Sequence, residues 1–90
     1  MRFEWNKTKN HVNLAKHGVD FSDVVAVFED DLALTRPDPD AHDEARFVTL
    51  GLDGLGRHAV VVFTEGEDVI RIISARLASR QERKTYESGL

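Results

Sequence analysis

Three consecutive runs of alternating residues in the second half of the chain constrain the fold most. The runs are Ala45–Leu52, Arg57–Thr64 and Asp68–Ser74, and a short glycine-bearing segment follows each of the first two. Successive side chains of a β-strand point to opposite faces, and glycine-bearing turns between such runs indicate hairpins. The sequence therefore predicts an antiparallel meander. The register of the first hairpin stays open, and with it the face that carries Arg46.

The last two runs predict a sheet with one fully apolar face. A two-residue turn at Gly66-Glu67 would place Val62 opposite Arg71 and Phe63 opposite Ile70. The face expected to form the core then carries Ala59, Val61, Phe63, Ile70 and Ile72. The other face is apolar with two basic side chains set into it, and it carries His58, Val60, Val62, Val69, Arg71 and Ile73.

Capping signals predict two helices in the first third of the chain. Asn6 is a suitable N-cap for a helix over Lys7–His17, and Gly18 is a suitable left-handed stop. Ser22 can cap a second short helix over Asp23–Glu29. Two short strands are expected as well, at Phe3–Trp5 and Leu32–Thr35.

A capping box predicts a third helix at the end of the chain. The Ser79 hydroxyl can accept from the backbone N–H of Glu82, whose carboxylate can reach back to the N–H of Ser79. The helix should run over Arg80–Ser88, with Gly89 in a left-handed conformation. The fold class is therefore α+β: two N-terminal helices, an antiparallel β-sheet meander and a short basic C-terminal helix.

The length and the absence of special segments bound the class of protein. Ninety residues predict a single domain, 1–90. The chain has no cysteine and no apolar run near 18 residues, and its first ten residues lack the apolar core of a signal peptide. We therefore expect a cytoplasmic protein without disulfides or a membrane span.

Charge is distributed unevenly along the chain. The net charge is −4, yet residues 1–19 and 69–90 each carry +3, whereas residues 20–44 carry −8. If the two ends meet in the fold, they form one positive face that suits nucleic acid. The alternative is an ordinary set of solvated charges. The same two interpretations apply to the polar stripe of Lys9, Asn13 and Lys16, and to the basic cluster of Arg80, Arg83 and Lys84.

An acidic segment in the middle of the chain raises the question of a metal site. Pro37-Asp38-Pro39-Asp40 predicts an irregular loop that continues to Glu44. The loop contains four carboxylates and His42, but their spacing matches no standard metal-binding template. We expect a solvated acidic loop, and we predict neither a metal nor a cofactor.

Two motifs, KHGVDF and IISARLASRQERKTYE, resemble the BrnT toxin family. The opening of the chain resembles that of the family at Phe3-Glu4-Trp5, Lys9, Asn13-Leu14, Lys16-His17-Gly18-Val19 and Phe21. The middle and the end resemble it at Arg46-Phe47-Val48, Gly51, Gly56-Arg57, Ile72-Ile73-Ser74-Ala75-Arg76, Ala78, Glu82-Arg83 and Tyr86-Glu87. One departure is Asn6, where the family pattern suggests Asp after the tryptophan; both residues cap helices.

The resemblance implies a bacterial type II toxin–antitoxin component with a RelE-like fold. Such a toxin is a ribonuclease that arrests growth by cutting RNA. The implied partner is a BrnA-like antitoxin, a DNA-binding protein that covers the toxin. Operator DNA would then be reached only through the antitoxin.

RNA cleavage without a metal ion indicates which residue types to look for. The 2′-hydroxyl attacks the adjacent phosphorus, which requires a base, an acid and cations for the developing charge. Arginine suits the last task, because its guanidinium is always charged and matches phosphate oxygens. The predicted catalytic residues are Arg71, Arg76, Arg80 and His17, with His58 as an alternative for proton transfer. The predicted RNA-binding residues are Lys9, Lys16, Arg46, Arg83 and Tyr86, the last to stack on a base or donate its proton.

Two other functions remain open at the level of sequence. A catalytically inactive protein could bind the antitoxin through the same basic face and take part in operon autoregulation. A nucleic-acid-binding module acting alone is the third reading, and it is disfavoured by the negative net charge and by the lack of a strand with an aromatic stacking pair.

Overall fold

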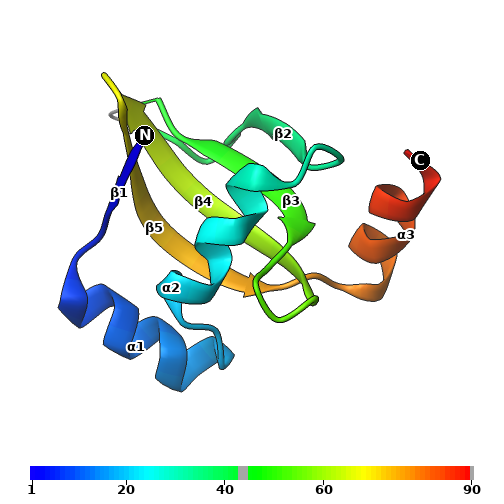
Figure 1. Ribbon diagram of the computed structural model, residues 1–90, viewed down its shortest axis with the longest axis horizontal. Coiled ribbons are helices and arrows are strands. Elements are labelled where there is room, and N and C mark those ends of the chain that lie inside the picture. Colours follow the sequence, from blue (N-terminus) through cyan, green and yellow to red (C-terminus); the bar gives the residue numbers. More distant parts are fainter. Residues whose placement is uncertain (43–44, 90) are drawn as a thin grey trace.

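The computed structural model describes residues 1–42 and 45–89 as one five-stranded sheet with helices on both faces (Figure 1). The first half of the chain contains β1 (Arg2–Glu4), α1 (Lys7–His17), α2 (Phe21–Val24), the 3₁₀ helix η1 (Val25–Glu29) and β2 (Leu34–Pro37). The second half contains β3 (Phe47–Leu52), β4 (His58–Gly66), β5 (Val69–Leu77) and α3 (Arg80–Ser88). The α+β class is therefore confirmed. No helix in this described part is long and apolar enough to cross a membrane.

The strand order is β1-β5-β4-β3-β2. The predicted meander is confirmed for β3, β4 and β5, and β2 extends it by pairing antiparallel with β3. β1 pairs parallel with β5, which the sequence did not predict because only the tertiary fold brings the two together. β2 was expected to end before the proline, but it includes Pro37. Proline is tolerated there because β2 is an edge strand.

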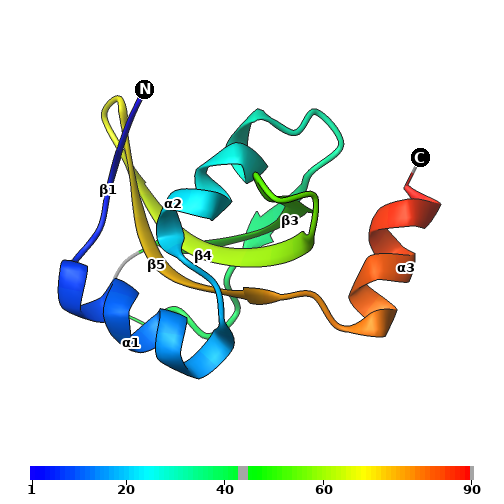
Figure 2. The same ribbon diagram turned by 60° about the horizontal axis from the view of Figure 1, so that its bottom comes forward.

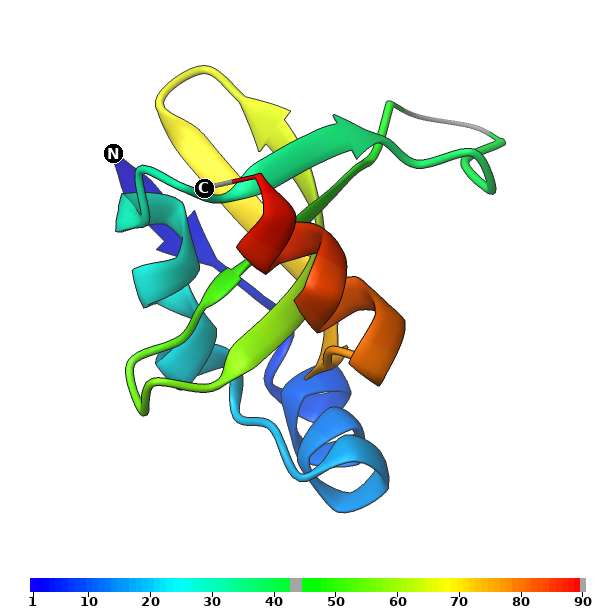
Figure 3. The same ribbon diagram turned by 90° about the vertical axis from the view of Figure 1, so that its right-hand side faces the viewer.

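The two faces of the sheet bury different groups of side chains. α2 and η1 cover one face, where the largest cluster includes Val19, Phe21, Ala59, Val61 and Ile72. α1 lies along the edge of β5. α3 covers part of the other face, where Tyr86 packs on Leu50 and Val60. Figures 2 and 3 show α3 on the opposite side of the sheet from α2. The five side chains predicted to form the core face are all buried.

The helices follow their predicted bounds with two exceptions. α1 begins after Asn6 and ends at Gly18, whose φ of 70° confirms the left-handed stop. The second helix begins at Phe21 rather than Asp23, because the Asp20 carboxylate caps it and Ser22 lies inside. Its second half tightens into the 3₁₀ helix η1. α3 has the predicted bounds and capping box, but Gly89 has a φ of −76°, so its predicted left-handed conformation is wrong.

The β4–β5 hairpin differs from its predicted register in two ways, a later turn and a β-bulge. Phe63 lies opposite Ile72 rather than Ile70, and the register shifts by one residue between Val62 and Phe63. The turn lies one residue later than predicted, with Asp68 at a φ of 56°. The bulge inserts one extra residue in β5, so the alternation of faces reverses past it.

The reversal decides which face carries the end of β5. Ile70 and Ile72 point into the core before the bulge, whereas Ala75 does so after it. Without the bulge, Arg76 would share the face of Ile70 and Ile72. With it, Arg76 lies opposite Val60 on the face that α3 partly covers.

Asn13 joins α1 to the free edge of β5. Its side-chain amide donates to the carbonyl of Ala75 at 2.8 Å and to the carbonyl of Val19 at 3.0 Å, and its oxygen accepts from the N–H of Ala75 at 3.1 Å. β1 pairs only with residues 69–71 of β5, so the amide replaces a strand partner further along. Asn13 is 6 % exposed. Both sequence-based interpretations of this residue, a solvated face and a phosphate contact, are therefore wrong.

We predict that Asn13→Ala lowers the free energy of unfolding by about 2–4 kcal/mol, because it leaves buried backbone groups of Ala75 and Val19 without partners. Asn13→Asp should be at least as costly, since a carboxylate cannot donate to the two carbonyls. Urea unfolding followed by circular dichroism measures both. Leu14→Ala, at a residue that is 44 % exposed on the same helix, is the control and should change stability by less than about 0.5 kcal/mol.

Candidate functional site

A hollow of about 260 Å³ lies on the sheet face that α3 partly covers. Its floor is formed by valines of β3 and β4, and its walls come from the end of α1, the end of β2 with the loop that follows, and the end of β5. Three basic side chains line it: His17, Arg36 and Arg76. The remaining side chains around it are Asp38, Pro39, Asp40, Val48, Val60, Val62, Ser74 and Ala75. Basic groups above an apolar floor suit an anion with an apolar attachment.

Arg76 is held in place by Glu82 of α3. Its two terminal nitrogens donate to the two carboxylate oxygens at 2.7 and 2.9 Å, and Glu82 also accepts from the backbone N–H of Ser79 at 2.8 Å. The hydrogen bonds from Arg76 are the main cause that lowers the pKa of Glu82 to about 2. The same hydrogen bond to Glu82 raises the pKa of Arg76. The pair orients the guanidinium where the strand meets the helix.

Arg36 is a residue of the candidate site that the sequence did not predict. It lies on the edge strand β2 opposite Val48, and it lines the hollow together with His17 and Arg76. Because the predicted strand ended at Thr35, the sequence assigned Arg36 to neither face of the sheet. One signal was available, because Arg36 is the single cation among the nine acids of residues 20–44.

His17 lies where this hollow meets a second one. The second hollow runs between α1 and β5, and Lys9, Lys16, His17 and Ser74 are among its lining residues. His17 and Ser74 belong to both hollows. The structure therefore brings four predicted site residues, Lys9, Lys16, His17 and Arg76, onto one continuous surface.

The loop after β2 forms an acidic wall. Asp38 accepts from the backbone N–H of Asp40 at 3.0 Å, and the Arg46 Nε lies 3.8 Å from the Asp38 carboxylate. Arg46 thus braces the loop behind the hollow. Among residues 1–42 and 45–89, no group of three His, Asp or Glu side chains is placed to hold a metal ion. Asp43 and Glu44 lie outside the described residues.

Three predicted arginines lie away from the hollow. Arg71 donates to the Glu4 carboxylate at 3.1 Å, near the β1 end of the sheet, and is not among the side chains that line the hollow. Arg80 and Arg83 are exposed on α3, whose sheet-facing residues include Glu82 and Tyr86. Their position does not support contact with a group bound between His17 and Arg76.

Tyr86 fastens α3 to the sheet and is only 4 % exposed. Its hydroxyl donates to Asp30 at 2.7 Å, and its ring meets His58 edge-on at a centroid distance of 5.0 Å. The hydrogen bond to Asp30 raises the pKa of Tyr86. Burial opposes ionisation of Asp30, but hydrogen bonds from Leu52 N–H and from Tyr86 outweigh it and lower the pKa of that carboxyl. The expectation that Tyr86 stacks on a base is wrong, because packing covers its ring. His58 lies against that buried ring.

Comparison with known proteins identifies the family. The sequence model of "Ribonuclease toxin, BrnT, of type II toxin-antitoxin system" matches residues 5–82, which include every side chain that lines the hollow. The chain belongs to the BrnT family. The described structure is also similar to the crystal structure of the Brucella abortus ribonuclease toxin BrnT, with a TM-score of 0.67 and 29 % sequence identity. That match covers 89 % of this chain and 99 % of the Brucella chain.

A comparison with curated proteins gives no match. The family model and the structural match nevertheless confirm the resemblance drawn from the two sequence motifs. BrnT proteins are ribonuclease toxins of type II toxin–antitoxin systems. The mixed α+β fold of this chain, with its five-stranded sheet, is similar to that of the Brucella BrnT.

We predict an acid-dependent loss of stability that depends on Glu82. Its pKa in the folded protein, about 2, lies below the ordinary value of 4.5. The ionised Glu82 therefore stabilises the fold above pH 4.5, and this contribution is lost as the pH falls toward 2. Thermal unfolding between pH 7 and pH 2 should show that Glu82→Gln is less stable than the wild type at pH 7 and that the gap narrows below pH 4.5. A gap that stays constant with pH would contradict this assignment.

Proposed function

We propose that this BrnT protein is an endoribonuclease that cuts RNA in the hollow between α1, β2 and β5. The observation that carries the proposal is the convergence of His17, Arg36 and Arg76 on one hollow from three separate elements. Arginines match phosphate oxygens, and histidine is suited to proton transfer near neutral pH. Cutting RNA arrests growth until an antitoxin covers the toxin.

The proposed chemistry uses these side chains, water and the substrate. Arg76 and Arg36 bind the scissile phosphate and stabilise the charge that develops on it as the 2′-hydroxyl attacks phosphorus. His17 transfers one of the two protons, either from the attacking hydroxyl or to the leaving 5′ oxygen, and water transfers the other. Glu82 holds Arg76 until a phosphate oxygen takes its place as the acceptor, because both carry negative charge and both accept from guanidinium.

The surface beside the hollow offers a path for the RNA backbone. Lys9 and Lys16 lie along the second hollow, which meets the first at His17 and Ser74. Lysines bind phosphates as point charges and position a strand without reading its sequence. Arg83 is proposed to bind flanking backbone from α3, and Arg46 to support the acidic loop.

The antitoxin is BrnA-like, and operator DNA is bound only through it. The reaction is metal-independent and requires no cofactor. The protein acts in the cytoplasm as a single domain of residues 1–90 with a RelE-like fold.

We predict that Arg76→Ala and Arg36→Ala each reduce RNA cleavage by about 10²–10³-fold, the usual effect of removing one transition-state donor. His17→Ala should lower it by about 10²–10⁴-fold through loss of proton transfer. Induced expression in a bacterial host, with mapping of new RNA 5′ ends, measures cleavage and growth arrest together.

Arg71→Ala and Arg80→Ala are the matched controls, since both remove an exposed arginine that does not line the hollow. They should keep growth arrest within about threefold of the wild type. Loss of arrest in these variants, with arrest retained in Arg36→Ala and Arg76→Ala, would move the site to the outer surface. A folded wild-type protein that binds an antitoxin yet cuts no RNA would instead support the binding-only alternative.

The proposed reaction also predicts its products. Attack by the 2′-hydroxyl yields a 2′,3′-cyclic phosphate and a 5′-hydroxyl, and a 2′-deoxy substitution at the cleaved position should abolish cleavage there. Cleavage by the purified protein should persist in excess EDTA. Products with a 5′-phosphate, or a requirement for a divalent cation, would contradict the mechanism.

A further inference from the structure

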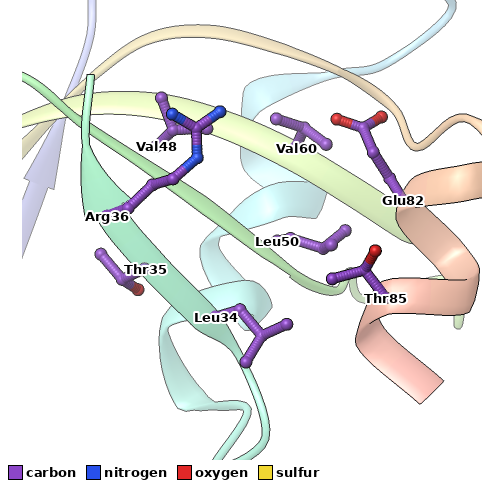
Figure 4. A pocket seen from close by; sticks show the side chains of 8 residues that line it. All are labelled: Leu34, Thr35, Arg36, Val48, Leu50, Val60, Glu82 and Thr85. Carbon is purple, nitrogen blue, oxygen red and sulfur yellow. The ribbon is translucent and has the colours of Figure 1, made fainter. Parts of the chain in front are cut away.

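A groove of about 220 Å³ lies beside the proposed cleavage site, between the edge strand β2 and α3. Its floor is Val48, Leu50 and Val60, and Leu34 and Thr85 face each other across it from β2 and α3 (Figure 4). Leu34 is 40 % exposed although it lies against other apolar side chains. The groove is smaller than the about 300–1,000 Å³ of pockets for drug-sized ligands, and it suits one flat ring system.

The groove is continuous with the site that binds phosphate. Arg36, Val48 and Val60 line both hollows. Glu82, which holds Arg76, lines the groove from the α3 side. In Figure 4, Arg36 and Glu82 lie on opposite sides of the groove, from β2 and from α3. A ligand with a phosphate against Arg36 and Arg76 therefore has an apolar slot within reach of its neighbouring sugar.

We propose that this groove is the subsite for one nucleobase of the RNA, next to the cleaved phosphate. The inference rests on the proposed function, because it places the base relative to the phosphate that Arg36 and Arg76 bind. The two faces of a base are apolar and gain by leaving water, and the valine and leucine side chains offer matching surface. The distribution of charge also fits a nucleotide, because Arg36 lies at the end proposed for the phosphate and apolar side chains line the rest of the floor.

The polar groups on the α3 wall indicate which edge of the base they read. Thr85 uses its hydroxyl proton on the carbonyl of Gln81, so its oxygen is left as an acceptor. Glu82 is a carboxylate and only accepts. Two acceptors suit a base with an exocyclic amino group, so cytosine should bind better than uracil, which has a carbonyl at the same position.

The test uses non-cleavable 2′-O-methyl pentanucleotides of cytidine, of uridine and of the abasic ribose-phosphate backbone, with the full chain. Methyl NMR should show ring-current shifts at Leu34, Leu50 and Val60 with the cytidine pentamer and none with the abasic one. Thr85→Leu, which fills the groove, should weaken cytidine binding by about tenfold, the size of one base contact, and leave abasic binding unchanged. Lys84→Leu, at the neighbouring exposed position, should leave the cytidine-to-abasic affinity ratio unchanged.

The outcomes separate this proposal from the proposed function. If both the cytidine and the abasic pentamer shift the signals of Arg36 and Arg76 while the methyl groups stay unaffected, phosphate binding holds and the base subsite is overturned. Equal affinity for cytidine and uridine would overturn recognition by the acceptors of α3. Failure of every pentamer to bind would overturn both proposals.

Discussion

The side-chain amide of Asn13 is the interaction on which the arrangement of the site depends. β5 is paired with β1 only at residues 69–71, so its edge near Ala75 would be open without another partner. Asn13 supplies a donor and an acceptor at that point, and its second proton bonds the Val19 carbonyl after the helix has ended. Because buried backbone groups must be paired, the amide fixes both the position and the rotation of α1 on the sheet. His17, one turn further along, is thereby held beside Ser74.

The bulge in the β4–β5 hairpin has an equally large effect on the arrangement of the candidate site. A regular strand that buries Ile70 and Ile72 would point residue 76 into the core, where an arginine has no place. One inserted residue lets Ala75 take the buried position, so Arg76 reaches the open face. Bulges often redirect side chains next to active sites, and here the redirected side chain is the one that meets Glu82.

α3 forms one side of the groove and carries exposed basic side chains. One side of it is attached to the sheet by Tyr86 through Asp30, and its first turn is attached to β5 by the pair of Glu82 and Arg76. The exposed side keeps Arg80, Arg83 and Lys84. A helix this short and polar would be marginal alone, so these contacts account for its position. The groove proposed for a nucleobase exists because the helix stands beside β2 and does not lie flat on the valine floor.

Local chemistry in the sequence determined the parts of this protein that depend on neighbours in the chain. The caps at Asn6 and Ser79, the stop at Gly18 and the alternating strands predicted three β-strands and two of the helices, since capping and alternation act over a few residues. Two motifs pointed to the family and contain Lys16, His17 and Arg76. The tertiary structure alone decided the parallel pairing of β1, the bulge and the buried role of Asn13, because each depends on contacts between distant segments. The tertiary structure also showed that Arg36 lines the hollow and that Arg71 does not. The sequence gives the charge of both residues, but the pairing of an edge strand with its neighbour decides which face its side chains point to.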